Sequence, residues 1–455
     1  MAKKKIINDF TTGPIMKSLI VFSVPFMLSN ALQVAYSLVD MIVVGQVVGS
    51  YGLSAVNVAS QVFTFVTMVA LGFCSGGQVY ISQLIGAKHE NRLNATIGTL
   101  FTFIISFSLI MSAFCLLFRN QVLHLLDTPV EAYDMALDYL LVCGSGVIFT
   151  YGYNLVSAIL RGMGDSKHPF VFISIASVMN LVLDILFVKY LNMSVFGAAL
   201  ATILGQAFSF IASIIYLYHN KEMFHFDFKL ESFKMDMPIF SNLCKLGIPF
   251  AIQSAAINIS MLYVNKLVNG IGVYASATFG VGIKLDDIVN KITQGISVAV
   301  SAMVGQNFAA KKHDRVVKTA INAWIFGAGF YMIFTIAYFM FNKQMFGWFT
   351  EDQEVIELAP TFVKAIVVSF PAMVLMRGTN GFIQGIGNAK MSLVFALLDG
   401  FVFRIGLSYL FGIVMGMGFY GFILGFALAP YGTGVPCAIY MFSGKWKKFK
   451  LITDR

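Results

Sequence analysis

Hydrophobic residues run through this chain in long stretches, and short polar segments separate one stretch from the next. A helix needs about 20 mainly apolar residues to cross a bilayer, and most of these stretches are longer than that. The pattern predicts twelve membrane helices, at residues 15–46, 52–84, 94–118, 133–159, 169–190, 195–218, 239–268, 274–308, 318–341, 355–384, 391–413 and 418–443. We therefore expect an all-α polytopic membrane protein.

The second half of the chain repeats the first at a distance of 223 residues. The segment SQLIGAKHENR (82–92) matches GQNFAAKKHDR (305–315), and LRGMGDSKHP (160–169) matches IQGIGNAKMS (383–392). Six helices per copy is an even number, so both copies enter the membrane from the same side. Parallel repeats of this kind form two bundles that hold a substrate between them.

The repeat predicts two six-helix bundles related by a pseudo-twofold axis along the membrane normal. Its boundaries divide the chain into an N-terminal lobe at residues 1–217, a cytoplasmic linker at 218–236 and a C-terminal lobe at 237–455. The N-terminal lobe is the one expected to carry a cation site, for reasons given below.

Composition agrees with a membrane protein, since 58% of the 455 residues are hydrophobic and 12% are charged, where a soluble chain has about 25% charged residues. Twenty Lys and Arg residues lie on one side of the predicted membrane, against four on the other. Because positively charged loops stay inside, we expect both termini in the cytoplasm and the protein in the cell membrane. The net charge of +9 is then a sign of orientation, and no nucleic-acid partner is expected. The five cysteines and six histidines show no spacing typical of a disulfide framework or a zinc site.

The first helix carries an acid, Asp40, in the otherwise apolar stretch YSLVDMIVVG. A charge at the centre of a bilayer costs roughly 2.5–3.5 kcal/mol, so such residues usually have a function. At 3.6 residues per turn, Asn30, Gln33, Ser37 and Asp40 fall within an arc of about 80°, and Tyr36 flanks them. This stripe is expected to face other helices or a water-filled cavity.

Three further helices of the first half carry polar stripes, with Gln61 in helix 2, Asn180 and Asp184 in helix 5, and Thr202 in helix 6. A carboxyl group held away from water, near a second carboxyl, binds a proton more readily than one in solution. The same oxygens, with those of Asn180 and Thr202, would also suit Na+. The alternative is that Asp40 and Asp184 only hydrogen-bond neighbouring helices, and that Gln33, Tyr36 and Asn154 serve in helix packing.

Four motifs occur in order along the twelve helices: VPF in helix 1, the Gly-x-Gly-[Asp/Asn]-x-Lys loop once in each half, NLVLD in helix 5 and GIKLDDI in helix 8. In this order the whole chain resembles the multidrug and toxic compound extrusion (MATE) family. The resemblance implies the two-bundle fold and export of amphipathic, often cationic compounds by alternating access. It also implies a cation-coupling site at Asp40, Asn180, Asp184 and Thr202, with H+ or Na+ as the coupling ion and no other cofactor.

The resemblance extends to other residues of the first helices. It favours Pro25 as a hinge, since proline removes a backbone hydrogen bond and kinks a helix; the alternative is a static bend. Substrate contacts are expected among the polar residues of the first lobe, namely Asn30, Gln33, Tyr36, Gln61 and Asn154. Helix 7 has no acid and helix 10 has Arg377 instead of one, so the sequence is more similar to the DinF-like branch, whose site lies in the first half.

Other functions remain open at this stage. No G-x-x-x-x-G-K-[ST] loop occurs in the sequence, so ATP is not the expected energy source, and the protein is not expected to be an enzyme. The nearer alternative is a flippase for lipid-linked oligosaccharides, for which Arg377 and Arg404 would supply positive charge. The charges of Lys284, Asp286, Asp287, Lys291 and Asp399 are expected to form structural pairs or to shape a cavity or gate. We expect a monomer whose partners are small cationic molecules and membrane lipids.

Overall fold

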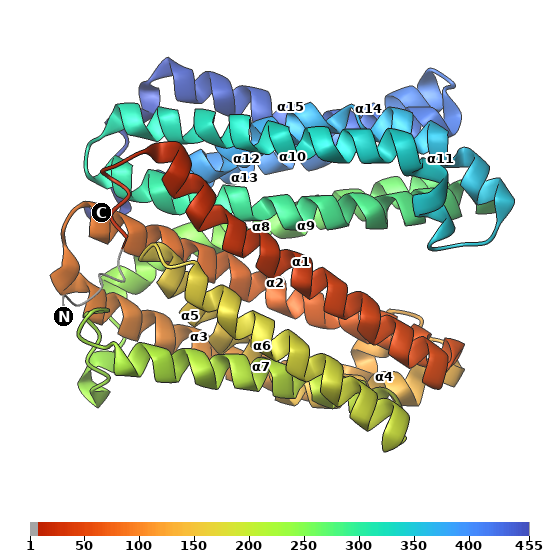
Figure 1. Cartoon of the computed structure of the whole chain (residues 1–455), viewed down its shortest axis with the longest axis horizontal. Helices are drawn as coiled ribbons and strands as arrows, with labels where there is room; N and C mark the ends of the chain where they lie inside the picture. The colour runs from red at the N-terminus through yellow and green to blue at the C-terminus, as the bar shows by residue number, and fades with distance from the viewer. Residues whose placement is uncertain (1–7, 455) are drawn as a thin grey trace. The chain divides into compact units, whose positions relative to one another are not determined.

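A computed structural model describes residues 8–454, which form helices joined by short loops and contain no β-strand (Figure 1). The α-helices are α1 Ile15–Val47, α2 Ser50–Gly86, α3 Leu93–Leu125, α4 Val130–Ser145, α5 Val147–Gly162, α6 Lys167–Asp184, α7 Ser194–His219, α8 Met237–Asn269, α9 Val273–Ala309, α10 His313–Gly347, α11 Gln353–Ile366, α12 Ser369–Gly385, α13 Ala389–Leu397, α14 Gly406–Tyr409 and α15 Gly418–Ser443. The predicted all-α fold is confirmed.

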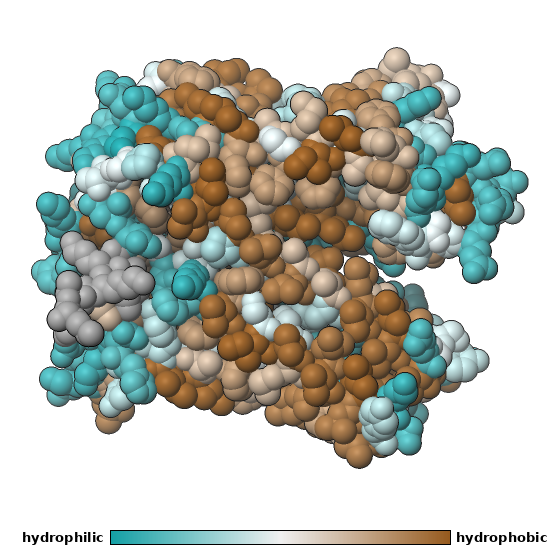
Figure 2. Space-filling view, in the orientation of Figure 1, coloured by the Kyte–Doolittle hydropathy of each residue, from teal (hydrophilic) through white to brown (hydrophobic). Residues whose placement is uncertain are grey.

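Ten helices in the described part of the chain are long and apolar enough to cross a membrane, and the number is twelve if each of two bent pairs counts as one span. Figure 2 shows hydrophobic residues along the sides of the helices and hydrophilic residues gathered near their ends. The helices agree with the twelve predicted spans. The basic residues 3–5 and Arg455, which contribute to the predicted orientation, lie outside the described residues.

The fourth and tenth predicted spans are each broken into two helices. The α4–α5 pair is bent by 48° and the α11–α12 pair by 49°. The first break lies at Gly146, where an added Cβ would come within 2.4 Å of Ile203. The second lies at Val367 and Val368, shortly before Pro371, whose missing N–H leaves the carbonyl four residues earlier without its helical partner.

The fifth and eleventh spans contain π-helical segments instead of ending as regular α-helices. These segments are η2 Ile185–Tyr190, η4 Leu398–Ile405 and η5 Leu410–Val414. A π-helical turn re-aims side chains and is frequent at functional sites. η2 begins directly after Asp184, so the predicted acid of helix 5 lies where the helix changes its winding.

The described chain divides into two compact units, and two helices contribute to both. The first unit contains Leu28–Ile248 together with Asn8, and the second contains Asp9–Met27 together with the chain from Pro249 onward. The helix α1 thus changes unit two residues after Pro25, and α8 changes unit at Pro249. The sequence-based division placed residues 9–27 in the N-terminal lobe and residues 237–248 in the C-terminal lobe.

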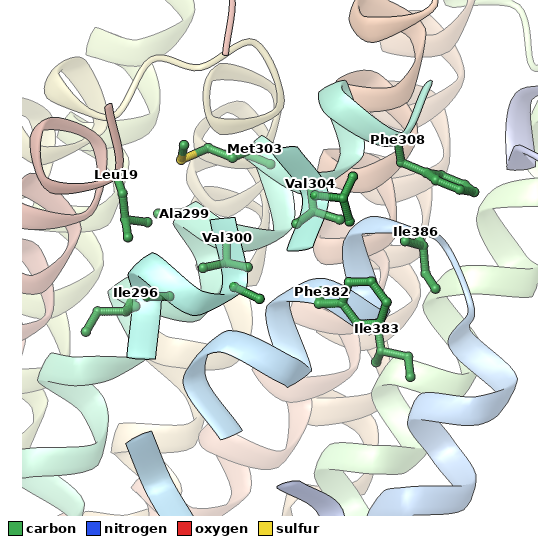
Figure 3. Close-up of a cluster of buried hydrophobic side chains, with 14 of the residues drawn as sticks. Leu19, Ile296, Ala299, Val300, Met303, Val304, Phe308, Phe382, Ile383 and Ile386 are labelled. Carbon is green, nitrogen blue, oxygen red and sulfur yellow. The ribbon is translucent and has the colours of Figure 1, made fainter. Parts of the chain in front are cut away.

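Hydrophobic packing explains why the start of α1 belongs to the second unit. Leu19, Phe22 and Phe26 are buried in one cluster with side chains of α9 and α12, among them Ile296 and Phe382 (Figure 3). Burial of a large apolar side chain stabilises by about 1.5–3 kcal/mol, so these contacts fix the first half of α1 in the second unit.

The doubled glycine loops have the same structure in both halves. Gly164 and Gly387 have φ of 84° and 77°, the left-handed region that glycine adopts without strain. The next residue accepts a hydrogen bond from the backbone at the start of the following helix: Asp165 from His168 N at 3.2 Å and Asn388 from Met391 N at 3.2 Å. The motif therefore ends one helix and caps the next.

The predicted linker packs onto α3 within the first unit. The Thr102 hydroxyl donates to the Phe233 carbonyl, and Asn94 Nδ2 donates to Ser232 Oγ at 3.1 Å. Asp227 accepts hydrogen bonds from Ser232 Oγ and Lys229 N, and these bonds hold the pKa of the Asp227 carboxyl below its usual value. The linker is thus an ordered part of the first unit.

Candidate functional site

The two predicted acids of the first unit are buried and lie near each other. Asp40, in the second half of α1, is 9% exposed, and Asp184, at the end of α6, is 1% exposed. The two carboxyl groups interact electrostatically with each other, and both interact with Tyr36. Neither acid forms an ion pair with a Lys or Arg of the described residues. Asp40 therefore faces the interior of the unit, away from lipid.

Several oxygen and nitrogen atoms around these acids have no hydrogen-bond partner among residues 8–454. They are one carboxylate oxygen of Asp40, one of Asp184, both side-chain amide atoms of Asn180 and the amide oxygen of Gln206. A buried polar atom without a partner costs about 1–3 kcal/mol, and native proteins contain few of them. A cluster of such atoms fits a group that binds there, such as a proton, a water molecule or a small cation.

A small cavity adjoins this cluster and is lined by α1, α6 and α7. Its volume is about 10 Å³, close to the space that one water molecule requires. The polar lining consists of Tyr36, Ser177, Asn180, Thr202 and Gln206. The cavity is therefore of the size of a single ion or water molecule, and too small for an organic substrate.

The approach of α6 and α7 around this cavity depends on Gly205. A Cβ added at Gly205 would lie 3.2 Å from the Ala176 carbonyl oxygen and 3.4 Å from Asn180 Cβ. The Thr202 hydroxyl donates to the carbonyl of Ala198 at 3.0 Å, so its oxygen lone pairs remain available to the cavity. Small residues let membrane helices pack closely, and here this brings polar side chains of both helices together.

The chemistry of the lining suits a proton or a small hard cation. The groups near the cavity are carboxylate, amide and hydroxyl oxygens, which hard cations prefer. No group of three or more His, Cys, Asp or Glu with metal-site geometry occurs within residues 8–454. Two ionised carboxyl groups close together repel each other, so binding of a proton or a cation between them is favoured.

The structure brings some of the predicted site residues together and leaves others apart. Tyr36, Asn180 and Thr202 line the cavity. Asp40 and Asp184 are not among its lining residues, but both interact electrostatically with Tyr36. Asn154 Nδ2 donates to the Thr150 carbonyl of its own helix at 2.8 Å. The predicted substrate residues that do not line the cavity are Asn30, Gln33, Gln61 and Asn154, of which Gln61 is exposed on α2.

Two residues near the acids were not among the predicted site residues. Gln206 lines the cavity, and its position one helical turn after Thr202 was a usable signal. Tyr139 of α4 is 5% exposed and interacts electrostatically with Asp40 of α1. No spacing in the sequence connects α4 with α1, so this contact was not predictable.

The second unit contains a separate polar network on α9, α10 and α12. Arg377 Nη2 donates to Asn290 Oδ1 at 2.7 Å and to the Tyr331 hydroxyl at 3.3 Å. Asn290 Nδ2 in turn donates to Asp286 Oδ2 at 2.8 Å. Nearby, Arg404 Nη2 donates to Asp399 Oδ1 at 3.0 Å.

One ion pair of the second unit, Asp399 with Arg404, is neutralised inside the unit. Arg404 also lies over the Phe426 ring, 4.5 Å from its centroid, and Asp399 accepts a second bond from the Thr433 hydroxyl at 3.2 Å. Asp399 and Arg404 are 1% and 5% exposed. The pair fits the structural role expected from the sequence, since the two charges neutralise each other, Asp399 accepts a further hydrogen bond from Thr433 and Arg404 packs on Phe426.

Comparisons with known proteins place the chain in a family. It matches the MatE family over residues 25–186 and again over 249–410. It is 29% identical to the probable multidrug resistance protein YpnP of Bacillus subtilis over 451 residues, covering 98% of this chain and 99% of the relative. It is 25% identical to the multidrug export protein MepA of Staphylococcus aureus over 396 residues, 86% of each chain.

Solved structures share the fold. An outward-facing multidrug resistance MATE family transporter of the MOP superfamily has a TM-score of 0.91 at 20% identity, covering 98% of this chain and 99% of that one. A MOP superfamily transporter from Pyrococcus furiosus has the same TM-score and identity, covering 98% of this chain and 100% of that one. The family match over both halves of the chain shows that this protein belongs to the MatE family, the multidrug and toxic compound extrusion transporters.

Proposed function

We propose that this protein is an antiporter that couples the entry of H+ or Na+ to the export of amphipathic, often cationic organic compounds. The observation that carries the proposal is the buried pair of Asp40 and Asp184, each of which has, among residues 8–454, no ion-pair partner and one oxygen without a hydrogen bond. Membership of a transporter family supports the direction and the substrate class, because the relatives YpnP and MepA are described as multidrug resistance and export proteins.

The two acids, with Asn180 and Thr202, form the coupling site in this proposal. When the site faces the outside, a proton or Na+ binds and cancels part of the negative charge of the pair. When the site faces the cytoplasm, the ion leaves and the restored negative charge favours a cationic substrate. Gln206, Tyr36 and Tyr139 contribute to the polar surroundings of the carboxyl groups. Coupling follows because ion and substrate compete for the same negative charge.

Pro25 is the proposed hinge of this cycle. It lies inside α1, and α1 passes from the second unit to the first two residues later. Bending at this point would move the segment that carries Asp40 without disturbing Leu19 and Phe22, which are fixed in the second unit. Gln33, Asn30, Gln61 and Asn154 remain the proposed substrate contacts of the first unit.

The energetics limit what one ion can drive. One charge that crosses roughly 100 mV gains about 2.3 kcal/mol, and one pH unit is worth about 1.4 kcal/mol. Exchange of one proton for one monovalent cation moves no net charge, so only the concentration gradients count. Two ions per substrate would also use the voltage, and two acids make this stoichiometry available.

We place the protein in the cell membrane with both termini in the cytoplasm, as the distribution of Lys and Arg indicates. A monomer supplies the site, since all of its residues come from the first unit of one chain. The flippase alternative relied on Arg377 and Arg404, and both guanidinium groups bind partners within the second unit. The acids of the first unit favour a cationic substrate over an anionic lipid pyrophosphate.

The test is dye efflux from proteoliposomes under separately imposed gradients of pH, Na+ and voltage. We expect a gradient of H+ or Na+ across the vesicle membrane to drive a cationic dye in the direction opposite to the movement of the ion. If one ion is exchanged for one dye cation, dye efflux will not depend on the membrane voltage. If two ions are exchanged, dye efflux will change with the voltage. Dye movement that is the same with and without both ion gradients would contradict the proposal.

A further inference from the structure

The first unit contains an apolar groove that is lined by α3, α7 and the linker and not by the two acids. Its volume is about 370 Å³, which lies within the usual range of ligand pockets, roughly 300–1,000 Å³. Every described side chain that lines the groove is a phenylalanine or an isoleucine. The groove therefore suits an apolar ligand and provides no side-chain group for an ion or a charged compound.

Two glycines allow the walls of the groove to pack as they do. A Cβ added at Gly152 of α5 would overlap the ring of Phe210, a lining residue of α7, so the glycine lets this ring pack onto α5. A Cβ added at Gly98 of α3 would overlap the carbonyl oxygen of Ser232, so the linker can approach α3 closely only because this residue is glycine. The groove is thus bounded by closely packed parts of the chain.

Aromatic rings of the linker form the wall of the groove near the helix ends. Phe228 and Phe233 line the groove, and the Phe233 ring meets the Phe101 ring of α3 edge-on, with centroids 6.0 Å apart. The buried Phe226 ring stacks on Phe101 at 5.8 Å and lies 4.6 Å from the Phe228 ring. This wall is therefore held in place by its own ring contacts with α3.

The lengths of α3 and α7 place the groove just inside the hydrocarbon core of the membrane. The helices have 33 and 26 residues, or about 50 and 39 Å at 1.5 Å per residue. The hydrocarbon is about 30 Å thick, so centred helices extend about 10 and 5 Å beyond it at each end. Phe101 lies about 12 Å from the start of α3, and Ile215 lies about 6 Å from the end of α7. Both lining residues are therefore at the depth where acyl chains begin.

The open side of the groove faces the acyl chains. Ile211 and Ile215 line the groove and are 53% and 52% exposed. They belong to α7, which like α3 is long and apolar enough to cross a membrane. Water is absent at this depth, so the groove is accessible from the hydrocarbon of the bilayer.

A lysine lies beside the linker end of the groove. Lys221 Nζ is 5.4 Å from the centroid of the Tyr218 ring, and this ring in turn meets the Phe228 ring edge-on at 5.3 Å. Lys221 and Tyr218 are exposed, and side chains of both types favour the boundary between hydrocarbon and headgroups. The neighbouring acid Asp227 accepts hydrogen bonds within the linker. Lys221 thus supplies positive charge where the headgroup of a lipid in the groove would lie.

We propose that the groove binds one phospholipid from the leaflet on the linker side, with an acyl chain between α3 and α7 and the phosphate near Lys221. The apolar lining selects the chain, and the ammonium group, a compact charge with three donors, selects the phosphate. The lipid is a resident ligand and not a transported compound, so this inference goes beyond the proposed function. It also does not depend on Asp40 and Asp184.

The first test measures the phospholipid that stays with the detergent-purified protein after extensive washing, by mass spectrometry of the lipid extract. Ile211→Trp fills the groove, and Ile175→Trp is the matched control, since Ile175 of α6 is 44% exposed and is not a lining residue. We expect a stoichiometric amount of phospholipid in the wild type and in the control, and about tenfold less in Ile211→Trp. Thermal unfolding reports that each variant is folded.

The second test adds lipid back to delipidated protein and follows the unfolding temperature. We expect a phospholipid to raise this temperature more than the diacylglycerol with the same acyl chains. Lys221→Gln should remove the difference, and Lys343→Gln, an exposed lysine of α10, should keep it.

Three results would overturn the inference: no phospholipid on the washed wild type, equal retention by the two tryptophan variants, or equal stabilisation by phospholipid and diacylglycerol. Stabilisation by a cationic dye that Ile211→Trp abolishes, with no effect of phospholipid, would also overturn it and would assign a transported compound to the groove. Asp40→Asn should retain the phospholipid, so a failure of the proposed ion coupling and a failure of the lipid site are distinguishable.

Discussion

Asp184 is the less exposed of the two acids, and it lies at a change of helical winding. It lies at 1% exposure where α6 changes to the π-helical segment η2, while Asp40 is 9% exposed in α1. Both have an oxygen without a partner among the described residues. If the ion is shared, the loss of either charge removes the competition between ion and substrate.

We therefore predict that Asp184→Asn abolishes gradient-driven dye efflux, reducing it to the rate of liposomes without protein. Asparagine has nearly the same shape as aspartate, so the fold should persist. A side-chain amide, however, does not bind a proton near neutral pH and supplies no negative charge. Asp227→Asn, in the linker outside the membrane, is the matched control and should transport normally. Normal coupled efflux by Asp184→Asn would assign the ion to Asp40 alone.

The sequence was informative about single residues where a charge is unusual for its surroundings. Asp40 and Asp184 were recognisable because acids in apolar helices are costly, and the structure does bury both. Gln206 was indicated by its position one helical turn after Thr202, but a polar stripe identifies a face of the helix and not the residue of that face that lines a cavity. Tyr139 could not be predicted from the sequence, because its interaction with Asp40 joins helices that are distant in the sequence.

At the scale of elements, the charged pairs of the second unit differ greatly in burial. Asp399 and Arg404 have side-chain exposures of 1% and 6%, and removal of one member of a buried pair costs about 3–5 kcal/mol because the other charge is left uncompensated. Lys291 and Asp287 are about half exposed, and such pairs contribute roughly 0–1 kcal/mol.

We predict that Arg404→Met lowers the free energy of unfolding by about 3 kcal/mol, while Lys291→Gln changes it by less than about 1 kcal/mol. The loss has two causes, the unpaired Asp399 and the missing contact of the guanidinium with Phe426. Thermal unfolding of both variants in detergent measures the difference. Equal stability of the two variants would show that the buried pair contributes little to the fold.

Helix positions were predictable to within a few residues because long apolar runs identify membrane spans. The two breaks were not, since Gly146 looked like one of many small residues, and its significance comes from the contact with Ile203. The structure groups residues 9–27 with the second unit, where Leu19 and Phe22 pack against α9, whereas chain order suggested the first lobe.

At the scale of the whole molecule, charge is distributed unequally between two repeats of the same fold. The first unit contains the buried acids Asp40 and Asp184, and the second contains the buried acids Asp286 and Asp399. Of these four, only Asp399 has an ion-pair partner among residues 8–454. Asp286 instead accepts a hydrogen bond from Asn290. In the proposed function the first unit binds the coupling ion.

The most direct test of the central claim uses Asp40→Asn, with thermal unfolding in detergent and gradient-driven dye efflux from proteoliposomes measured on the same preparation. We predict that the variant unfolds at a temperature close to that of the wild type, which shows that it is folded, but expels no dye under a pH or Na+ gradient. Efflux at the wild-type rate, still driven by either gradient, would contradict the claim that the Asp40 carboxyl carries the ion.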